Sequence, residues 1–202
     1  MMKTTIFLIR HGETEWNKEK RFQGQKDIPL NRFGQSQAEK VAQRFYKENY
    51  KVDAVYSSDL KRAKETAKAI AYHYGKDVQV HIGLRERSYG LLEGNKIEDI
   101  TAKYGIHLGN LEEAGAFDVE PFHLLKNRVY SAVREIVKWH AGENVVIVSH
   151  GGAINSLLHE ISQGEYGPGK TRIVNTSITT ITYDHLLNFF HIEDVNNASH
   201  VE

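Results

Sequence analysis

Cysteine is absent from the 202 residues of this chain. Disulfide bonds are therefore excluded, and so is every reaction that uses a thiolate nucleophile. An excess of charge of one sign is also missing, because Lys plus Arg and Asp plus Glu both total 26. This balance gives no support for a general nucleic-acid binder or an anionic-membrane binder. No repeat, low-complexity tract or Pro/Ser-rich linker divides the chain.

Long apolar runs are missing as well. The N-terminal run, residues 5–9, ends at Arg10. It is too short for the apolar region of a signal peptide or for the roughly 20 residues of a membrane span. We therefore expect a cytoplasmic protein with no membrane partner and no nucleic-acid partner. A chain of this length, with 40% hydrophobic residues, suits a single globular domain.

Strand-like and helix-like segments alternate along the sequence. Runs rich in β-branched residues predict strands, and apolar residues at helical spacing predict helices. The expected strands cover residues 5–9, 52–56, 78–82, 145–148, 177–183 and 188–192, and the expected helices cover residues 34–46, 60–74, 96–104, 121–140 and 151–161. We expect the second helix to be capped by Ser57, Ser58 or Asp59. The pattern predicts an α/β fold: a three-layer α/β/α sandwich around a mostly parallel central sheet, with a C-terminal hairpin.

Two segments lack a regular pattern. Residues 11–33 are predicted to form one long loop, and a loop of that length in a compact domain is usually functional. Residues 84–120 contain five glycines and one short helical stretch. We therefore expect a single domain over residues 1–202, in which residues 84–120 form an insertion that acts as a lid.

Three basic or imidazole-bearing features follow expected strands. Arg10 and His11 end the first strand, His150 follows the strand at 145–148, and Arg62 lies in the first turn of the helix after the second strand. Parallel sheets bind ligands beyond the carboxyl ends of their strands. Helix N-termini there add backbone N–H donors suited to an anion. Each residue alone is more often a surface or core residue, but together they predict a phosphate site.

At this point the sequence resembles the histidine phosphatase superfamily, in its phosphoglycerate-mutase-like branch. The matching segments lie between residues 7 and 152 in the family's order, and they are Phe7-Leu8-Ile9-Arg10-His11-Gly12-Glu13-Thr14, Glu15-Trp16-Asn17, Phe22-Gln23-Gly24, Pro29-Leu30, Gly34, Ala38, Tyr56-Ser57-Ser58-Asp59-Leu60-Lys61-Arg62-Ala63, Thr66-Ala67, Leu84-Arg85-Glu86-Arg87, Gly90, Glu93-Gly94 and Val148-Ser149-His150-Gly151-Gly152.

The resemblance implies a reaction and a role for each matched residue. His11 would be the nucleophile that becomes a phosphohistidine, and Glu86 would protonate the leaving group. Arg10, Arg62 and His150, the last as an imidazolium, would hold the phosphoryl oxygens in place of a metal ion. The remaining implied phosphate or substrate contacts are Gly12, Asn17, Gln23, Gly24, Tyr89 and Gly151. The implied enzyme uses no cofactor and no metal, and its partner is a small phosphorylated metabolite.

The proton donor depends on the resemblance, because the residues alone leave it open. A general acid is needed since an alkoxide is a poor leaving group. The candidates that the residues alone do not separate are Glu86, Glu93, Glu112 and Glu113. An ordinary surface carboxylate is the alternative interpretation of Glu86, which lies between two arginines.

Hydrolysis is expected in preference to phosphoryl transfer between positions of one substrate. Cofactor-dependent phosphoglycerate mutases in the family carry a longer insertion with an adjacent Arg pair before the second histidine. Residues 87–149 are short and contain no such pair, and a buried phosphate needs explicit cationic partners. Tyr89 and Lys96 do resemble mutase contacts, so the mutase remains the alternative.

Other functional interpretations are weaker. Residues 164–171 match the phosphate-loop pattern of nucleotide-binding proteins, with Lys170 as its lysine, but the pattern requires a strand before it and a helix after it. Here a helix is expected before it and a strand after it. A non-catalytic phosphoester-binding scaffold is disfavoured because every expected catalytic residue is present. No His-Glu-x-x-His metal motif occurs. An exposed edge strand would allow a homodimer.

Two groups near the expected site have both a functional and a structural interpretation. Cations that would suit a second substrate phosphate at the entrance are Lys20, Arg21, Lys26 and Arg32. Apolar residues that would form a lid for alkyl or aryl groups are Leu91, Leu92, Leu108, Leu111 and Phe117. For both groups the structural interpretation, a solvated surface and an ordinary core, is preferred.

Overall fold

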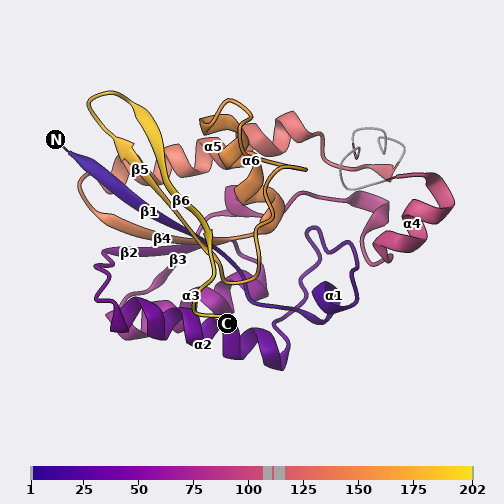
Figure 1. Cartoon of the computed structure of the whole chain (residues 1–202), viewed down its shortest axis with the longest axis horizontal. Helices are drawn as coiled ribbons and strands as arrows, with labels where there is room; N and C mark the ends of the chain where they lie inside the picture. Colours follow the sequence, from indigo (N-terminus) through magenta and orange to yellow (C-terminus); the bar gives the residue numbers. More distant parts are fainter. Residues whose placement is uncertain (1, 107–110, 112–116, 202) are drawn as a thin grey trace.

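In the computed structural model, a six-stranded sheet lies between two pairs of helices (Figure 1). The structure describes residues 2–106, 111 and 117–201. The strands are β1 (Lys3–Arg10), β2 (Ala54–Ser57), β3 (Val78–Val80), β4 (Asn144–Ser149), β5 (Ile178–Asp184) and β6 (Phe189–Asn197). The helices are α1 (Glu15–Lys18), α2 (Arg32–Lys47), α3 (Lys61–Tyr74), α4 (Ile97–Tyr104), α5 (Phe122–Trp139) and α6 (Gly151–Ile161), with 3₁₀ turns η1 (Ile82–Leu84) and η2 (Gly90–Leu92).

The strand order is β3-β2-β4-β1-β5-β6. The first four strands of this order pair in parallel, and β5 pairs antiparallel with both β1 and β6. The predicted mostly parallel α/β sandwich is therefore confirmed. Because β1 pairs in register with β4, Arg10 lies beside Ser149, and the residues that follow both strands meet at one edge of the sheet.

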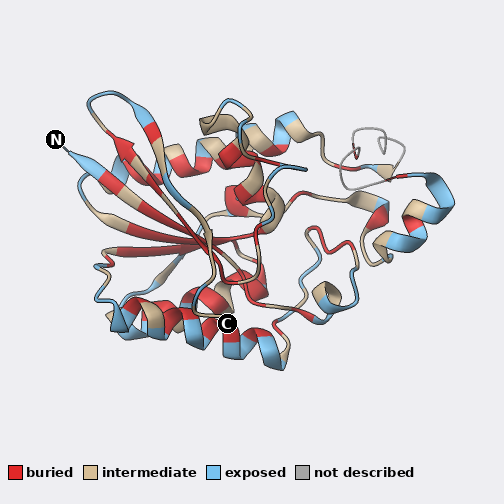
Figure 2. Ribbon diagram, viewed as in Figure 1, coloured by how far each residue is buried: buried red, intermediate tan, exposed pale blue. Residues whose placement is uncertain are grey.

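Two apolar cores cover the two faces of the sheet, as the red core segments in Figure 2 show. On one face, α2 and α3 pack through residues such as Val41, Phe45 and Ile70. On the other, α5 and α6 pack through residues such as Val133 and Leu157. Burial of these side chains contributes roughly 1.5–3 kcal/mol for each large aliphatic or aromatic residue. The sheet edge that carries the site is thus held by both cores.

The cap predicted for α3 is wrong. Its N-cap is Leu60, without a side-chain hydrogen bond. Asp59 instead pairs with Arg85. The carboxylate of Asp27, in the long loop, accepts a hydrogen bond from the Lys61 N–H at 2.7 Å and so caps the helix from a distant part of the chain.

Three smaller expectations need correction. The third strand ends at Val80, and Ile82 begins the turn η1 instead of closing the strand. The segment 11–33 is not wholly irregular, because the short helix α1 forms after Thr14, which makes a reciprocal capping box with Asn17. Pro121 is the N-cap of α5 and not its first residue.

The segment predicted as a lid packs a small apolar core together with Phe22 of the 11–33 loop. The buried apolar residues of this core are Phe22, Leu92, Ile100, Ile106, Leu111 and Val119, with Phe117 and Tyr89 against them. The core interpretation of Leu92, Leu111 and Phe117 is therefore confirmed, whereas Leu91 is 67% exposed. Leu108, Glu112 and Glu113 lie outside the described residues. No helix in the described parts of the chain has the length and apolar character needed to cross a bilayer.

Candidate active site

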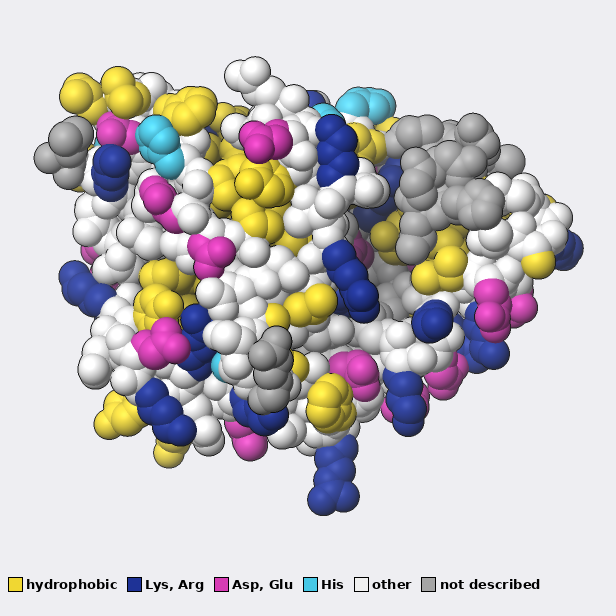
Figure 3. Space-filling model, in the orientation of Figure 1, with side chains coloured by type: hydrophobic (Ala, Val, Ile, Leu, Met, Phe, Trp, Pro, Cys, Tyr) yellow, Lys and Arg dark blue, Asp and Glu magenta, His cyan; other side chains and the backbone are white. Residues whose placement is uncertain are grey.

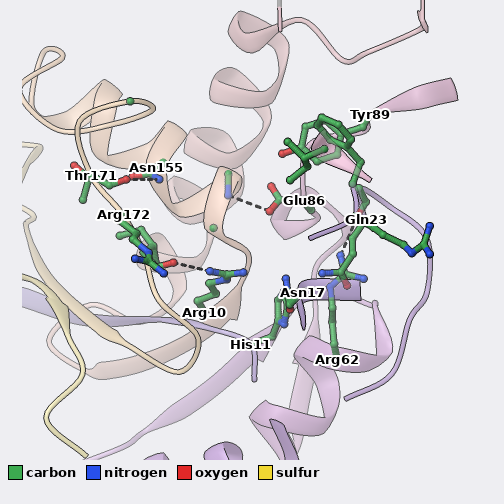
Figure 4. A pocket seen from close by; sticks show the side chains of 18 of the residues that line it. Arg10, His11, Asn17, Gln23, Arg62, Glu86, Tyr89, Asn155, Thr171 and Arg172 are labelled. Atoms are coloured by element: carbon green, nitrogen blue, oxygen red, sulfur yellow. Dashed lines mark hydrogen bonds between the residues drawn. The ribbon is translucent and has the colours of Figure 1, made fainter. Parts of the chain in front are cut away.

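A cavity of about 550 Å³ opens beyond the carboxyl ends of β1 and β4 (Figure 4). Its walls come from the end of β1, the 15–24 loop, α3, the turn after η1, the start of α6 and the loop between α6 and β5. Of the site residues expected from the sequence, those that line it are Arg10, His11, Asn17, Gln23, Gly24, Arg62, Glu86, Tyr89 and Gly151. His150 and Gly12 lie directly behind this lining: His150 against the ring of His11, and Gly12 against α3.

The imidazole of His11 is held in one orientation by two hydrogen bonds. Nδ1 lies 2.7 Å from the Gly12 carbonyl oxygen, which can only accept, so Nδ1 carries the proton. Nε2 is then left with a lone pair, and the Nε of Arg62 donates to it at 3.2 Å. The Gly12 N–H donates to Thr66 Oγ1, and the Asn175 amide donates to the His11 carbonyl, so the backbone on both sides of the ring is fixed. This arrangement presents Nε2 as a nucleophile.

The protonation state of His11 follows from its surroundings. Burial, followed by the positive charges of Arg62 and Arg10, lowers its pKa well below the ordinary value of 6.5, although the hydrogen bond to Gly12 acts in the opposite direction. The side chain is 3% exposed, so water does not compensate for the lost hydration of a charged ring. His11 is therefore neutral at neutral pH, which a nitrogen nucleophile requires.

Arg62 is the largest fully buried side chain of the described residues. Its two terminal nitrogens donate to the Lys26 carbonyl at 2.7 Å and the Gly24 carbonyl at 2.8 Å, so the long 11–33 loop holds it in place. Burial lowers its pKa to about 10, which leaves it cationic at neutral pH. The loop thus fixes a cation against the nucleophile.

Arg10 enters the cavity from the other side of His11 (Figure 4). One terminal nitrogen donates to the Ile173 carbonyl at 2.7 Å. Its Nε is buried and has no hydrogen-bond partner among the described residues. A buried donor without a partner is costly, and the cost disappears when an anion occupies the cavity.

His150 shows the same pattern. It is the N-cap residue of α6 and is fully buried. Its Nε2 lies 2.8 Å from Ser58 Oγ, and its Nδ1 is buried without a partner in the described structure. Burial, then the positive charge of Arg62 and the smaller effect of Arg10, lowers its pKa well below 6.5. The structure therefore favours a neutral His150 in the free site instead of the imidazolium expected from the resemblance.

Glu86 is separated from the other carboxyl groups by its contacts. It lines the cavity and accepts hydrogen bonds from the N–H groups of Gly152 at 3.0 Å and Ala153 at 3.1 Å, at the start of α6. Glu93 does not line the cavity; it accepts from the N–H groups of Gln25 and Tyr89 and so ties two loops together. Between these two, geometry gives Glu86 access to the cavity and Glu93 a structural role.

The electrostatic character of the cavity is positive. Five lining side chains are cationic, Arg10, Arg21, Arg62, Lys170 and Arg172, and one, Glu86, is acidic. The space-filling view in Figure 3 shows dark-blue Lys and Arg side chains along the hollow on this face of the molecule. Of the four cations considered for the entrance, only Arg21 lines the cavity, and Arg32 lies at a different surface hollow. Within the described residues, no group of three His, Asp or Glu side chains is arranged to hold a metal ion.

Sequence reasoning missed several supporting residues. Ser58 and Thr66 lie inside the matched motifs, but only the fold shows that they hold His150 and Gly12. Asn155 and Arg172 lie outside the motif positions, and no local pattern marks them. The phosphate-loop match has no support, because residues 164–171 lie between α6 and β5 with no helix after them. Lys170 nevertheless lines the cavity.

Curated relatives match nearly the whole chain. A phosphatase of Bacillus subtilis, PhoE, described as uncharacterized, is 33% identical over 198 residues, covering 98% of this chain and 97% of the relative. A metal-independent phosphoserine phosphatase of Arabidopsis thaliana is 38% identical over 88% of this chain and 76% of its own length. A probable phosphoglycerate mutase, GpmB, of Salmonella arizonae is 33% identical over 98% of this chain and 94% of its own length.

Solved structures agree with the fold described above. YhfR of Bacillus stearothermophilus superposes with a TM-score of 0.85 at 30% identity, covering 98% of this chain and all of that one. A mutant phosphoserine phosphatase from Entamoeba histolytica, in complex with phosphoserine, gives a TM-score of 0.83 at 29% identity, with 98% and 100% coverage. The model of the histidine phosphatase superfamily, branch 1, matches residues 6–197. The chain therefore belongs to branch 1 of the histidine phosphatase superfamily.

Proposed function

We propose that this protein is a metal-independent phosphomonoesterase that hydrolyses small phosphate esters through a phosphohistidine on His11. The observation that carries the proposal is the unprotonated Nε2 of a buried, neutral His11 at the cavity wall, with Arg62 beside it. A phosphoryl group placed there meets a nucleophile and fixed cations together. Preorganised charge of this kind is the main source of catalysis in phosphoryl transfer.

In the first step His11 Nε2 attacks phosphorus and the ester P–O bond breaks. The electron pair of that bond leaves with the ester oxygen, which takes a proton from the Glu86 carboxyl group. The guanidinium groups of Arg10 and Arg62 and the Nδ1–H of His150 hold the equatorial phosphoryl oxygens. The buried, unpartnered Arg10 Nε and His150 Nδ1 supply donors for this purpose. The Asn17 side chain and the Gly151 N–H add further hydrogen bonds.

In the second step water attacks the phosphohistidine. Glu86, now a carboxylate, takes a proton from this water, and the P–N bond breaks as its electron pair returns to His11 Nε2. Inorganic phosphate is released and both side chains return to their starting states. Glu86 thus acts as an acid in the first step and as a base in the second, so the reaction needs no further proton-transfer residue.

Hydrolysis is supported over mutase activity by the residues available for a second phosphate. Lys96, which resembles a mutase contact, is the N-cap residue of α4, pairs with Glu98 at 3.8 Å, and is not among the cavity-lining residues. Segment 87–149 contains no adjacent Arg pair. Named relatives include phosphatases and probable mutases, so the experiment must distinguish the two activities.

The test measures p-nitrophenyl phosphate hydrolysis near pH 6 in EDTA for the wild type, His11→Ala and the control His73→Ala, whose imidazole is exposed. We expect turnover in EDTA, its loss in His11→Ala only, and an acid-labile phosphoenzyme on rapid quenching of the wild type. Turnover restored only by Mg²⁺ would contradict the mechanism. In parallel, 3-phosphoglycerate is incubated with its bisphosphate cofactor. Release of 2-phosphoglycerate faster than inorganic phosphate would favour the mutase.

A further inference from the structure

Four of the five cations that line the cavity have hydrogen-bond partners among the described residues, and Arg172 does not. Lys170 donates to the Gly164 carbonyl. Arg62 and Arg10 are bound by backbone carbonyls next to His11. Arg21 donates to the Glu19 carboxylate and to the Gly94 carbonyl. Arg172 has no hydrogen bond and no ion pair with any described residue, and its side chain is exposed. A cation left free on a cavity wall is available to a ligand.

The backbone around Arg172 is fixed although the side chain is free. The Asn155 amide, on α6, donates to the carbonyl of Thr171 at 3.0 Å, and Arg10 donates to the carbonyl of Ile173 at 2.7 Å. Both neighbours of Arg172 are thus anchored, one of them to an arginine of the proposed phosphate site. Figure 4 shows Arg172 beside Arg10, on the wall across the cavity from Glu86 and Tyr89. A preorganised backbone lowers the entropic cost of using such a side chain in binding.

The positive charge of the cavity exceeds what one phosphate requires. A phosphate monoester carries up to two negative charges, which Arg10 and Arg62 balance. Arg172 then adds a repulsive charge, and its proximity contributes to the lowered pKa of Arg10, behind the larger effect of burial. A second anionic group on the substrate would remove this repulsion. One free guanidinium matches a carboxylate, whose two oxygens fit the guanidinium fork.

We propose that Arg172 forms a carboxylate subsite next to the phosphate site, and that the preferred substrates are small phosphomonoesters that carry a carboxylate close to the ester. The inference rests on the proposed phosphatase function and assigns a specificity-determining role to the loop between α6 and β5, outside the segments that match the family motifs. Arg10 of the phosphate site donates to the carbonyl of Ile173, the residue after Arg172, so the two sites are adjacent and one small molecule can carry both anionic groups.

The test uses pairs of substrates that differ in the carboxylate. O-phosphoserine is compared with O-phosphoethanolamine, and 3-phosphoglycerate with glycerol 3-phosphate, by phosphate release. The readout is the ratio of kcat/KM within each pair for the wild type, Arg172→Ala, Arg172→Lys and the control Arg32→Ala, which removes an exposed arginine outside the cavity. Ratios within a pair cancel general effects on folding and on the chemical step.

We expect the wild type to prefer the carboxylated member of each pair. Arg172→Ala should reduce the preference about tenfold, mainly through KM, as roughly expected for loss of one charge-assisted hydrogen bond. Arg172→Lys should retain part of it, and Arg32→Ala all of it. The subsite would be overturned if the wild type showed no preference for the carboxylated substrates, or if Arg172→Ala left the ratio of kcat/KM within each pair unchanged. The same ratio is measured for fructose 1,6-bisphosphate against fructose 6-phosphate. If Arg172→Ala reduced this ratio more than it reduced the carboxylate preference, Arg172 would be assigned to a second phosphate and the carboxylate subsite would be overturned. Absence of turnover of every ester would instead refute the phosphatase function itself.

Discussion

The Nε of Arg62 donates a hydrogen bond to the Nε2 of His11 at 3.2 Å. The cation that would stabilise the phosphoryl oxygens therefore also contacts the nitrogen that would attack phosphorus. Arg62 comes from α3 and His11 from the end of β1, and α3 packs on the sheet beside β2 and β4. The packing of α3 on the sheet therefore places Arg62 against the nucleophile, whereas the Gly12 carbonyl fixes the tautomer of His11 and burial is the main cause of its lowered pKa.

The lowered pKa of His11 gives the first prediction. Because burial and two arginines disfavour the imidazolium, the ring should stay neutral as the pH falls through 6.5. Nitrogen-15 NMR of histidine-labelled protein, assigned with His11→Ala, should show a neutral Nδ1–H tautomer at pH 6. A His11 that becomes protonated as the pH falls through 6.5 would contradict the environment described here.

A second prediction concerns the pH dependence of stability. His11 and His150 both have lowered pKa values in the folded protein. Below about pH 6.5 the unfolded chain binds protons at these residues and the folded chain does not, so the free energy of unfolding should fall as the pH decreases from 6.5. Urea unfolding from pH 5 to 8 measures this slope. His150→Asn should flatten this slope; a slope equal to that of the wild type would refute the linkage.

The convergence of several candidate site residues was predictable because they follow strands whose ends must meet at one edge of the sheet. Arg10, His11 and His150 belong to that group, and the sheet places them together. The choice of Glu86 over Glu93 was not predictable from local pattern, since both are glutamates in irregular chain. Only their tertiary hydrogen bonds, to α6 for Glu86 and to two loops for Glu93, distinguish them.

The errors of the sequence-based prediction have a related cause. The cap of α3 is wrong because Asp27, 34 residues from Lys61, supplies the carboxylate, while Asp59 is drawn to Arg85. A local rule considers only the residues next to the helix. Likewise Arg172 lies in an aperiodic loop, and only its anchored neighbours place it at the cavity.

A third prediction tests Glu86 as the proton donor. Glu86→Gln keeps the shape of the side chain but removes its acidity, so hydrolysis of alkyl phosphates should fall by roughly 10²–10⁴-fold. The loss should be much smaller for p-nitrophenyl phosphate, whose leaving group needs less protonation. Glu93→Gln is the matched control; it should affect both substrates equally, because that side chain only joins loops. The comparison uses kcat/KM, which does not include the later attack of water on the phosphohistidine. Equal losses of kcat/KM on both substrates in Glu86→Gln would exclude Glu86 as the proton donor.

A fourth prediction concerns Ser58, which lies 2.8 Å from His150 Nε2. Ser58→Ala leaves this nitrogen buried without a partner, at a cost of about 1 kcal/mol. In the proposed mechanism the Ser58 hydroxyl donates to Nε2 and so keeps the proton of His150 on Nδ1, and the substitution removes this donor. We expect kcat/KM to fall about tenfold, as for loss of one oriented donor to the phosphoryl oxygens. Ser57→Ala is the control, because Ser57 is equally buried and bonds only a carbonyl. If the two variants lost similar stability but Ser58→Ala lost more activity than Ser57→Ala, the role of Ser58 in orienting His150 would be supported. Equal activity losses in the two variants would reject that role.

A fifth prediction follows from the contact between Gly34, in the first turn of α2, and the chain after the nucleophile. A Cβ on Gly34 would lie 2.0 Å from the Glu13 carbonyl oxygen, and one on Gly12 would lie 2.4 Å from the Gly34 oxygen. Both partners are backbone atoms and cannot rotate away. Gly34→Ala should therefore destabilise the protein by about 1–3 kcal/mol, despite the better helix propensity of alanine.

The same substitution should also lower activity, because the displaced residues, Gly12 and Glu13, directly follow His11. A shift of this backbone moves Nε2 relative to Arg62, and misplacement of about 1 Å can cost about 10²-fold in rate. Urea unfolding and p-nitrophenyl phosphate kinetics on Gly34→Ala and the exposed control Gln35→Ala measure both effects. If Gly34→Ala matched Gln35→Ala in stability, the close backbone contact would be refuted. If it lost stability but kept full activity, the position of His11 would be set independently of α2.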